Sequence, residues 1–479
     1  MKTVMTRREC LLTLGAGASL FGANAKKPNI IFFLVDDLGW SDFSCYGGKY
    51  YETPNIDRFA KQAMRFTSAY AACPVCSPTR ASIMTGKYPQ RTGITDWLPG
   101  GKPPANSILR TPGIPTEMKL EEVTIPEMLK PLGYRTASIG KWHLGGKGFL
   151  PQDQGFEVNI AGNDRGNPGN YFGPFNFPNL QGGTKDDFIT EKLSDAADTF
   201  ITECAGKTPF FLYFPEYAVH TPLQARRDAI DKYKTKFGDK PFPNPIYAAM
   251  VESIDQAFGR LYKTLDRLGI TDNTIIMVTS DNGGLITEGR HQSAVTDNSP
   301  LRAGKGHLFE GGIREPLIVS WPGVTKPGST CDVPVSSIDY LPTILEMAGG
   351  EPPKSGQIDG KSITGLLRGQ NKPVHEAIFW HYPHYSPQGG TPACAVRKGD
   401  WKLIEFFEDG RLELFNLRQD IGERKNLVRK EPKIVAELHA LLQNWRKDVG
   451  AVLPTKNPAF DPAIVGEPRG GYEPPTPIA

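Results

Sequence analysis

The chain has 479 residues, of which 39% are hydrophobic and 22% charged, and its formal net charge is +3. This length and composition are typical of a globular protein with a sizeable core, in one large or two unequal domains. The nearly balanced charge argues against a nucleic-acid-binding surface, so an anionic ligand must be attracted by a local site.

The first 25 residues have the pattern of an export signal. Arg7 and Arg8 stand near its start, residues 11–21 form an apolar stretch too short to span a membrane, and residues 23–25 (ANA) give a small-residue cleavage site. The paired arginines resemble a twin-arginine signal, and an ordinary general-secretion signal is the alternative. We therefore expect an exported protein, periplasmic or extracellular, with no membrane span in the later sequence.

Two apolar runs end in the same kind of polar pair. Residues 30–35 have the character of a strand buried on both faces and end at Asp36 and Asp37, and the segment TIIMVTSDNGG repeats this pattern at Asp281 and Asn282. Strands that alternate with helices predict an open α/β sheet, in which ligands gather at the carboxyl ends of the strands. Further strands are expected at residues 135–139, 210–214 and 316–320, and helices at residues 247–268 and 338–348.

The pattern changes at about residue 351. Short strand candidates joined by turns predict an antiparallel sheet, and a helix with an apolar stripe from Ile434 to Trp445 follows them. The strands are expected at residues 377–382, 393–397, 401–407 and 411–415. We therefore divide the chain into an export signal (1–25), a large α/β domain with a mostly parallel sheet (26–350), and a smaller C-terminal α+β subdomain with an extended tail (351–479).

The polar residues at the two strand ends form a set of oxygen ligands: Asp36, Asp37, Asp281 and Asn282. Burying carboxylates is costly unless a cation holds them, and carboxylate with amide oxygens suits calcium, with magnesium as the alternative. Either pair alone could be a helix cap or a turn. Two copies of the pattern in one sheet favour a metal site.

A Cys-x-x-Cys pair begins the segment CPVCSPTRASIMTGKYPQRTG, residues 73–93. A zinc site would need a second pair of ligands, and a thioredoxin-like site would lie in a much smaller domain. The residues CSPTR at 76–80 instead resemble the maturation motif Cys-x-Pro-x-Arg of the type I sulfatases, which belong to the alkaline-phosphatase-like superfamily. The other motifs of that family follow in its order: the strand ending at Asp36 and Asp37, GKWHLG at 140–145, HTP at 220–222 and SDNGG at 280–284.

This resemblance implies a modified side chain at position 76. Cys76 would be converted to formylglycine (3-oxoalanine) by a formylglycine-generating maturation enzyme, and would share a calcium ion with the four oxygen ligands. A hydrated aldehyde offers one hydroxyl for attack on sulfur and a second whose deprotonation expels sulfate.

The resemblance also implies roles for the charged and titratable residues of the motifs. Arg80, Lys141 and Lys305 would surround the charge of the sulfate. His220, with Lys305, would protonate the leaving alcohol, and His143 would take a proton as sulfate leaves.

Recognition of the leaving group is expected from loops over the strand ends and from the C-terminal subdomain. Aromatic faces and forked donors suit a sugar ring, although each candidate could equally be a packed side chain or part of a surface loop. The segments TGITDWLPG and HYPHY look like those of bacterial exported sulfatases that act on sulfated galactose or N-acetylgalactosamine, with O4 as our guess for the sulfate position. The candidates are Asp96, Trp97, Arg165, His381 and His384.

The sequence therefore predicts a sulfuric ester hydrolase that removes sulfate from a saccharide. Two alternatives remain open: a phosphoester or phosphonate ester hydrolase of the same superfamily, and a catalytically silent protein that binds sulfated glycans.

Overall fold

The computed structural model describes residues 26–288, 293–353 and 356–464. The predicted export signal, residues 1–25, lies outside the described residues. Within the described ranges, no helix is both long enough and apolar enough to span a membrane.

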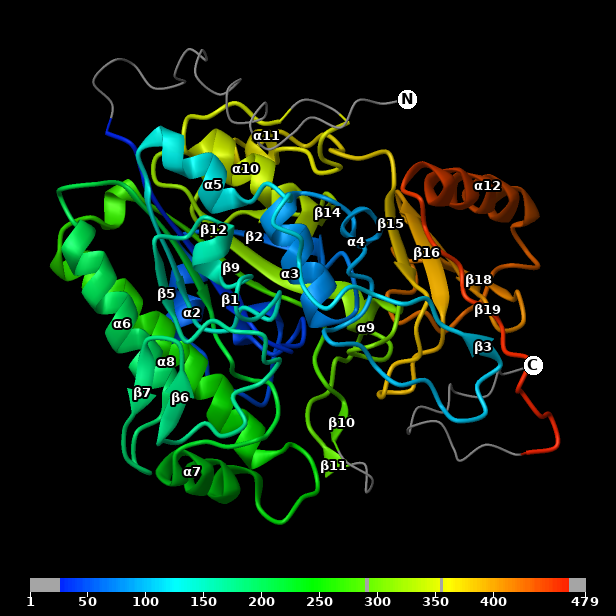
Figure 1. Ribbon diagram of the computed structural model, residues 1–479, viewed down its shortest axis with the longest axis horizontal. Coiled ribbons are helices and arrows are strands. Elements are labelled where there is room, and N and C mark those ends of the chain that lie inside the picture. Colours follow the sequence, from blue (N-terminus) through cyan, green and yellow to red (C-terminus); the bar gives the residue numbers. More distant parts are fainter. Residues whose placement is uncertain (1–25, 289–292, 354–355, 465–479) are drawn as a thin grey trace.

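A nine-stranded sheet forms the centre of the larger part of the molecule (Figure 1). Its strands lie in the order β13-β2-β12-β9-β1-β8-β4-β5, with β14 beside β2. β12 lies antiparallel between β9 and β2, and the other pairings of this sheet are parallel. The strands are β1 (Asn29–Val35), β2 (Met64–Tyr70), β4 (Arg135–Ile139), β5 (Val158–Ile160), β8 (Phe210–Pro215), β9 (Thr274–Ser280), β12 (Arg314–Ser320), β13 (Thr330–Cys331) and β14 (Val335–Ser336).

Helices cover both faces of this sheet. They are α2 (Pro54–Ala60), α3 (Cys76–Thr85), α4 (Pro89–Thr92), α5 (Ile125–Leu129), α6 (Ile189–Cys204), α7 (Arg227–Phe237), α8 (Pro245–Arg267), α9 (Glu310–Ile313), α10 (Tyr340–Met347) and α11 (Thr364–Leu367). In β1, Ile31 and Phe33 belong to the core under α6 and α8, whereas Ile30 and Phe32 belong to the core under α3 and α10 (Figure 1). Because successive side chains point to opposite faces, a strand between two helix layers must be apolar throughout.

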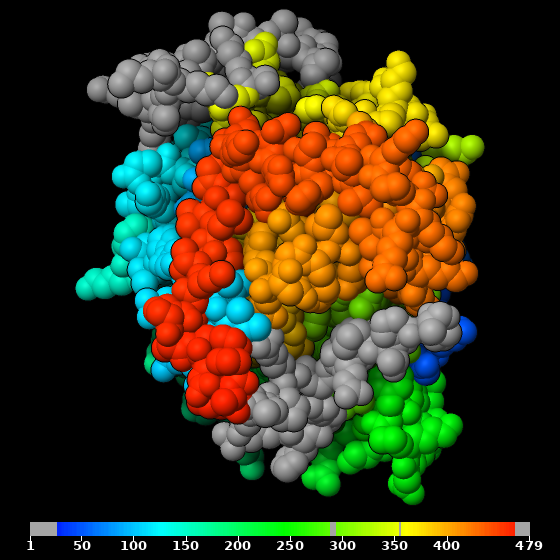
Figure 2. All heavy atoms as spheres, turned by 90° about the vertical axis from the view of Figure 1, so that its right-hand side faces the viewer, coloured from blue at the N-terminus to red at the C-terminus, as the bar shows by residue number. Residues whose placement is uncertain are grey.

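A smaller antiparallel sheet follows, in the order β15-β16-β17-β18. One face packs against α12 (Pro432–Asp448) through Leu438, Leu442 and Trp445, and the other face packs against the larger part of the molecule. After α12 the chain crosses the surface shown in Figure 2, where β19 (Thr455–Lys456) pairs with β3 (Leu109–Arg110). The remaining strands are β6 (Phe175–Phe177), β7 (Leu180–Gly182), β10 (Thr287–Glu288), β11 (Ser293–Ala294), β15 (Ile378–Tyr382), β16 (Ala393–Lys398), β17 (Trp401–Phe406) and β18 (Leu412–Asn416).

The sequence predicted most of these elements. The strands expected at residues 135–139 and 210–214 are β4 and β8, the helix expected at 247–268 is α8, and the C-terminal strands and helix are all present. β2 was not predicted. Its sequence, MRFTSAY, has polar residues at Arg65, Thr67 and Ser68, which interrupt the apolar run that marks the other central strands.

Buried ion pairs join the small sheet to the larger part of the molecule. Lys402 Nζ, in β17, lies 2.9 Å from Glu310 Oε1 and 2.9 Å from Glu423 Oε1, and all three side chains are fully buried. Glu310 also accepts hydrogen bonds from Tyr70 (2.7 Å) and Arg314 (3.0 Å). Burial raises the pKa of Glu310, but Lys402 and Arg314 outweigh it and bring the pKa to about 2. The ionised Glu310 therefore fixes α9 on β17.

We predict that Lys402→Met destabilises the protein by about 3–5 kcal/mol, because it removes the buried cation that Glu310 and Glu423 share. Lys398→Met, on the neighbouring strand β16, removes a more exposed lysine that pairs with Glu376 and Glu437, and should change the free energy of unfolding little. Urea denaturation followed by tryptophan fluorescence compares the two variants. If both substitutions lowered the free energy of unfolding equally, the stabilising role of the buried Lys402 ion pairs would be contradicted.

Candidate active site

The four predicted oxygen ligands come together at the carboxyl ends of β1 and β9. These strands pair in parallel, with Val35 opposite Ser280, so the residues that follow them meet at one edge of the sheet. The Asp37 amide donates to Asp281 Oδ1 (3.2 Å), and Asn282 Nδ2 donates to Asp37 Oδ1 (2.7 Å). All four side chains are buried.

Each of the three carboxylates has a buried cationic partner. The cations come from different elements: Lys141 follows β4, Arg80 lies in α3, and Lys305 lies in the loop before α9. Three negative and three positive charges thus balance within the buried cluster. The pairs are Lys141 Nζ to Asp36 Oδ2 (2.6 Å), Lys305 Nζ to Asp37 Oδ2 (2.7 Å) and Arg80 Nη2 to Asp281 Oδ2 (2.8 Å).

Cys76 is the first residue of α3 and faces His143. The Cys76 Sγ atom lies 3.3 Å from His143 Nδ1, and His143 Nε2 lies 2.6 Å from the carbonyl oxygen of Leu98. Because a carbonyl can only accept, Nε2 carries the proton and Nδ1 presents its lone pair toward residue 76. Burial raises the pKa of the Cys76 thiol and lowers that of His143 well below its usual value. An unmodified Cys76 would therefore be a neutral thiol and a poor nucleophile.

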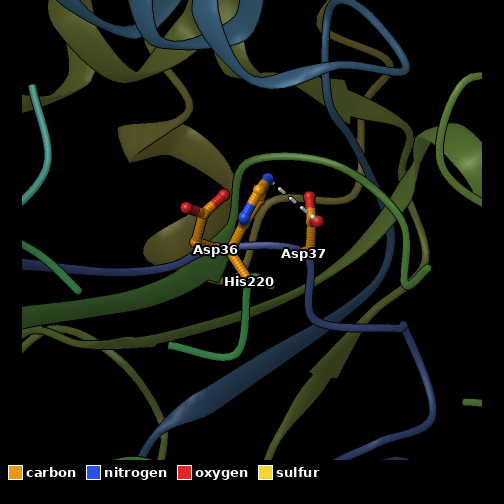
Figure 3. A group of neighbouring side chains, drawn as sticks. All are labelled: Asp36, Asp37 and His220. Carbon is orange, nitrogen blue, oxygen red and sulfur yellow. Dashed lines mark ion pairs between the residues drawn. The ribbon is translucent and has the colours of Figure 1, made fainter. Parts of the chain in front are cut away.

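His220 follows β8 and approaches the same carboxylates. Its Nε2 atom lies 3.5 Å from Asp37 Oδ2 (Figure 3), and its Nδ1 atom lies 2.8 Å from the carbonyl oxygen of Thr221. Burial, with the charge of Lys305, lowers the pKa of His220 to about 3. The neutral ring therefore holds its proton on Nδ1, and Nε2 and the carboxylate are two acceptors that face each other. Such a pair is stable only with a proton or a cation between the two atoms.

The donor set fits a hard cation. Asp36, Asp37 and His220 offer ligand atoms within 4.8 Å of one another. Asp36 Oδ1 and Asn282 Oδ1 are buried without a hydrogen-bond partner. Burial and the neighbouring Asp281 raise the pKa of Asp36 well above its usual value, so a further cation beside it would favour its charged form. A calcium ion would supply that charge and would give the two oxygens a partner.

Comparison with known proteins agrees with this geometry. The model of the family described as Sulfatase matches residues 28–350, and a model described as N-sulphoglucosamine sulphohydrolase, C-terminal, matches residues 304–448. The chain belongs to the sulfatase family. The enzyme is therefore a sulfuric ester hydrolase with the sulfatase fold.

Individual relatives cover most of this sulfatase. A protein named Sulfatase from Formosa agariphila is 34% identical, with 85% of each chain covered. The N-acetylgalactosamine-6-sulfatase of Homo sapiens is 32% identical, with 86% of this chain and 83% of the relative covered. Among solved structures, Ps i-CgsB in complex with k-i-k-neocarrahexaose is similar with a TM-score of 0.75 and 29% identity, over 91% of this chain and 95% of that one.

The predicted substrate-binding residues lie at different places relative to the catalytic cluster. The Asp96 carboxylate is buried and accepts hydrogen bonds from backbone amides of its own loop. Trp97 is half-buried against the core beneath the C-terminal sheet. Arg165 is exposed on a loop that contacts His143 through Gly166. His384 Nε2 lies 2.8 Å from Thr95 Oγ1, in the loop that carries Asp96.

His381 lies on the other face of the small sheet. In β15, Trp380 and Tyr382 face the larger part of the molecule, and Phe379 faces α12. Because side chains alternate along a strand, His381 shares the face of Phe379. Its Nε2 atom lies 2.9 Å from the carbonyl oxygen of Val452, after α12. The structure therefore does not bring His381 together with the other predicted residues.

Two contacts of His143 escaped the sequence analysis. The Leu98 carbonyl acts through the backbone, which leaves no signal in the residue type. A Cβ atom on Gly166 would lie 2.6 Å from His143 Cε1, so only glycine fits there without displacing the ring. The glycine-rich run GNDRGNPGN is the signal that could have indicated such a close approach.

We predict that Gly166→Ala displaces the His143 ring and lowers the turnover number about 10²-fold, as misplacement of a catalytic group by about 1 Å can do. Gly113→Ala is the matched control, because an added Cβ at Gly113 meets no atom within 4 Å. Release of inorganic sulfate measures both variants. Full activity of Gly166→Ala with an unchanged melting temperature would contradict the prediction.

Proposed function

We propose that this sulfatase removes O-sulfate from a saccharide, using formylglycine formed from Cys76 and a bound calcium ion. The observation that carries the proposal is the arrangement around residue 76. Its side chain, at the start of α3, faces the unprotonated nitrogen of His143. Three cations and the four oxygen-bearing side chains lie in the same buried cluster, which supports the proposal.

Formylglycine and calcium would supply complementary chemistry. Hydrated formylglycine would offer a hydroxyl to attack sulfur and a second hydroxyl whose deprotonation releases sulfate. Calcium, held by Asp36, Asp37, Asp281 and Asn282, would polarise the sulfate oxygens. Asp36 and Asn282 each have a buried side-chain oxygen that accepts no hydrogen bond, which supports this ligand set.

The chain's own residues would perform proton transfer and charge stabilisation. Lys141, Lys305 and Arg80 stabilise the negative charge on the sulfate oxygens, and the buried setting strengthens each contact. His143 Nδ1 accepts a proton from a hydroxyl at position 76. His220, with Lys305, would protonate the leaving oxygen once Nε2 has taken up a proton, because the neutral ring carries its proton on Nδ1.

We further propose sulfated galactose or N-acetylgalactosamine as the substrate, and O4 as the first position to test. The similar solved structure that holds k-i-k-neocarrahexaose, and the human relative named N-acetylgalactosamine-6-sulfatase, support a saccharide. The paired arginines and the apolar stretch within the first 25 residues support export to the periplasm or the exterior of the cell.

We predict that Cys76→Ala abolishes release of inorganic sulfate, whereas Cys73→Ala keeps at least a tenth of the wild-type rate. Both cysteines are buried, but Cys76 faces His143. Peptide mass spectrometry of active wild-type protein should show formylglycine at position 76. Measurable turnover by Cys76→Ala, or active protein that carries ordinary cysteine there, would overturn the mechanism.

The substrate screen pairs 4-O- and 6-O-sulfates of both sugars with aryl phosphate monoesters and diesters. Preference for a phosphate ester would favour the phosphohydrolase alternative. Binding of sulfated glycans without any release of sulfate would favour the silent binding protein.

We predict that calcium stabilises protein dialysed against EDTA. A ligand at 100 times its dissociation constant stabilises by about 2.7 kcal/mol, so the melting temperature should rise on titration with calcium and rise less with magnesium. Asn282→Ala should lose most of this rise, and Asp297→Asn, outside the ligand set, should keep it. An equal response from the two variants would refute the ligand assignment.

A further inference from the structure

The backbone of one residue, Leu98, links the segment of Cys76 to His143. The Leu98 carbonyl oxygen lies 2.6 Å from His143 Nε2, and the Leu98 amide donates to Ser77 Oγ (3.0 Å). Ser77 is the neighbour of Cys76 in α3, and Cys76 Sγ lies 3.3 Å from His143 Nδ1. These contacts close a ring, so the position of Leu98 decides how the imidazole meets residue 76.

Asp96 holds the loop that carries Leu98. Its Oδ1 accepts from the Trp97 amide (2.9 Å) and its Oδ2 accepts from the Gly101 amide (3.0 Å), which ties the two ends of the loop to one carboxylate. Asp96 is only 2% exposed. Both carboxylate oxygens already accept backbone amide protons, and therefore the geometry favours a role inside the protein over contact with substrate.

The C-terminal sheet contributes the third donor to this carboxylate. Tyr382, the last residue of β15, donates its hydroxyl proton to Asp96 Oδ1 (3.0 Å), and its side chain is 1% exposed. The ring of His384 packs edge-on against Tyr382 at 5.6 Å, and His384 Nε2 meets Thr95 in the same loop. The smaller subdomain thus contacts the loop 95–101 at two side chains.

We propose that Asp96 and Tyr382 are positioning residues that hold the Leu98 carbonyl against His143 Nε2 and so direct the Nδ1 lone pair at residue 76. The physical reason is that a neutral imidazole carries one proton, and a fixed acceptor at one nitrogen places the lone pair on the other. An outer residue that fixes a tautomer in this way acts on the chemistry without touching the substrate. The proposal rests on the role proposed above for His143.

The first test measures the tautomer and needs no activity. Full-length protein labelled with ¹⁵N-histidine, and carrying unmodified Cys76, gives the two ring nitrogens of each histidine in long-range ¹H–¹⁵N spectra, and the signal missing in His143→Gln assigns His143. Wild type should show a single form protonated at Nε2. Asp96→Asn and Tyr382→Phe should each move the two nitrogen shifts toward each other as the tautomers mix.

Tyr385→Phe is the matched control for this experiment. Tyr385 lies three residues from Tyr382, but its hydroxyl contacts Glu408 (2.8 Å) and the Leu109 amide (3.2 Å). Its spectrum should keep the wild-type His143 shifts. If Tyr382→Phe folds with an unchanged melting temperature and also keeps those shifts, the proposal is wrong, and Asp96→Asn provides the second variant should one of them fail to fold.

The second test separates the two halves of the reaction. In Tyr382→Phe and Asp96→Asn, the turnover number should fall about tenfold to a hundredfold, while kcat/KM changes less than threefold, because His143 acts when sulfate leaves rather than when the alcohol leaves. Quenched-flow samples should show the desulfated saccharide appearing before inorganic sulfate. A parallel fall of kcat and kcat/KM would indicate a general structural defect and contradict the proposal.

Failure of this positioning proposal can be distinguished from failure of the proposed function. Ordinary cysteine at position 76 in active protein would overturn the formylglycine mechanism and leave the tautomer result standing. Formylglycine present with unaltered His143 shifts in the variants would overturn only the positioning role.

Discussion

The structure depends on burying three carboxylates at one edge of a parallel sheet. Asp36, Asp37 and Asp281 are inaccessible to water, and a buried charge costs several kcal/mol unless it is paired. Strands β1 and β9 bring the acids together, and cations from three other elements must then reach the same place. The course of the chain through α3, past β4 and into the loop before α9 satisfies this electrostatic requirement.

The smaller subdomain stabilises that arrangement from outside. Lys402 anchors Glu310 at the start of α9, directly after the loop that carries Lys305, and Tyr382 contacts Asp96 in the loop that meets His143. One face of the antiparallel sheet therefore supports two catalytic segments that are more than 200 residues apart in the sequence. An apolar face and buried ion pairs attach the second sheet rigidly to the larger part of the molecule. A flexible linker alone would not hold the two segments in place.

The sequence predicted those site residues whose type and position at the end of a strand indicate their chemistry. An apolar run followed by acids predicted β1 and β9 and their meeting point, because a parallel sheet aligns carboxyl ends. Arg80, Lys141 and Lys305 were predicted from the family motifs instead, and each lies within 3 Å of a carboxylate. β2 was missed because its polar residues conceal a central strand.

The sequence by itself determined which functional groups are present and at which strand ends they gather, since both follow from local pattern. Only the tertiary structure decided which atoms they meet. The Leu98 carbonyl is a backbone acceptor that every residue possesses. The direction of His381 depends on which face of β15 is covered by α12, and the pairing of Lys402 with Glu310 joins the small sheet to the larger part of the molecule. These contacts arise from long-range packing, which fixes the orientation of a group but leaves no mark on its own residue type.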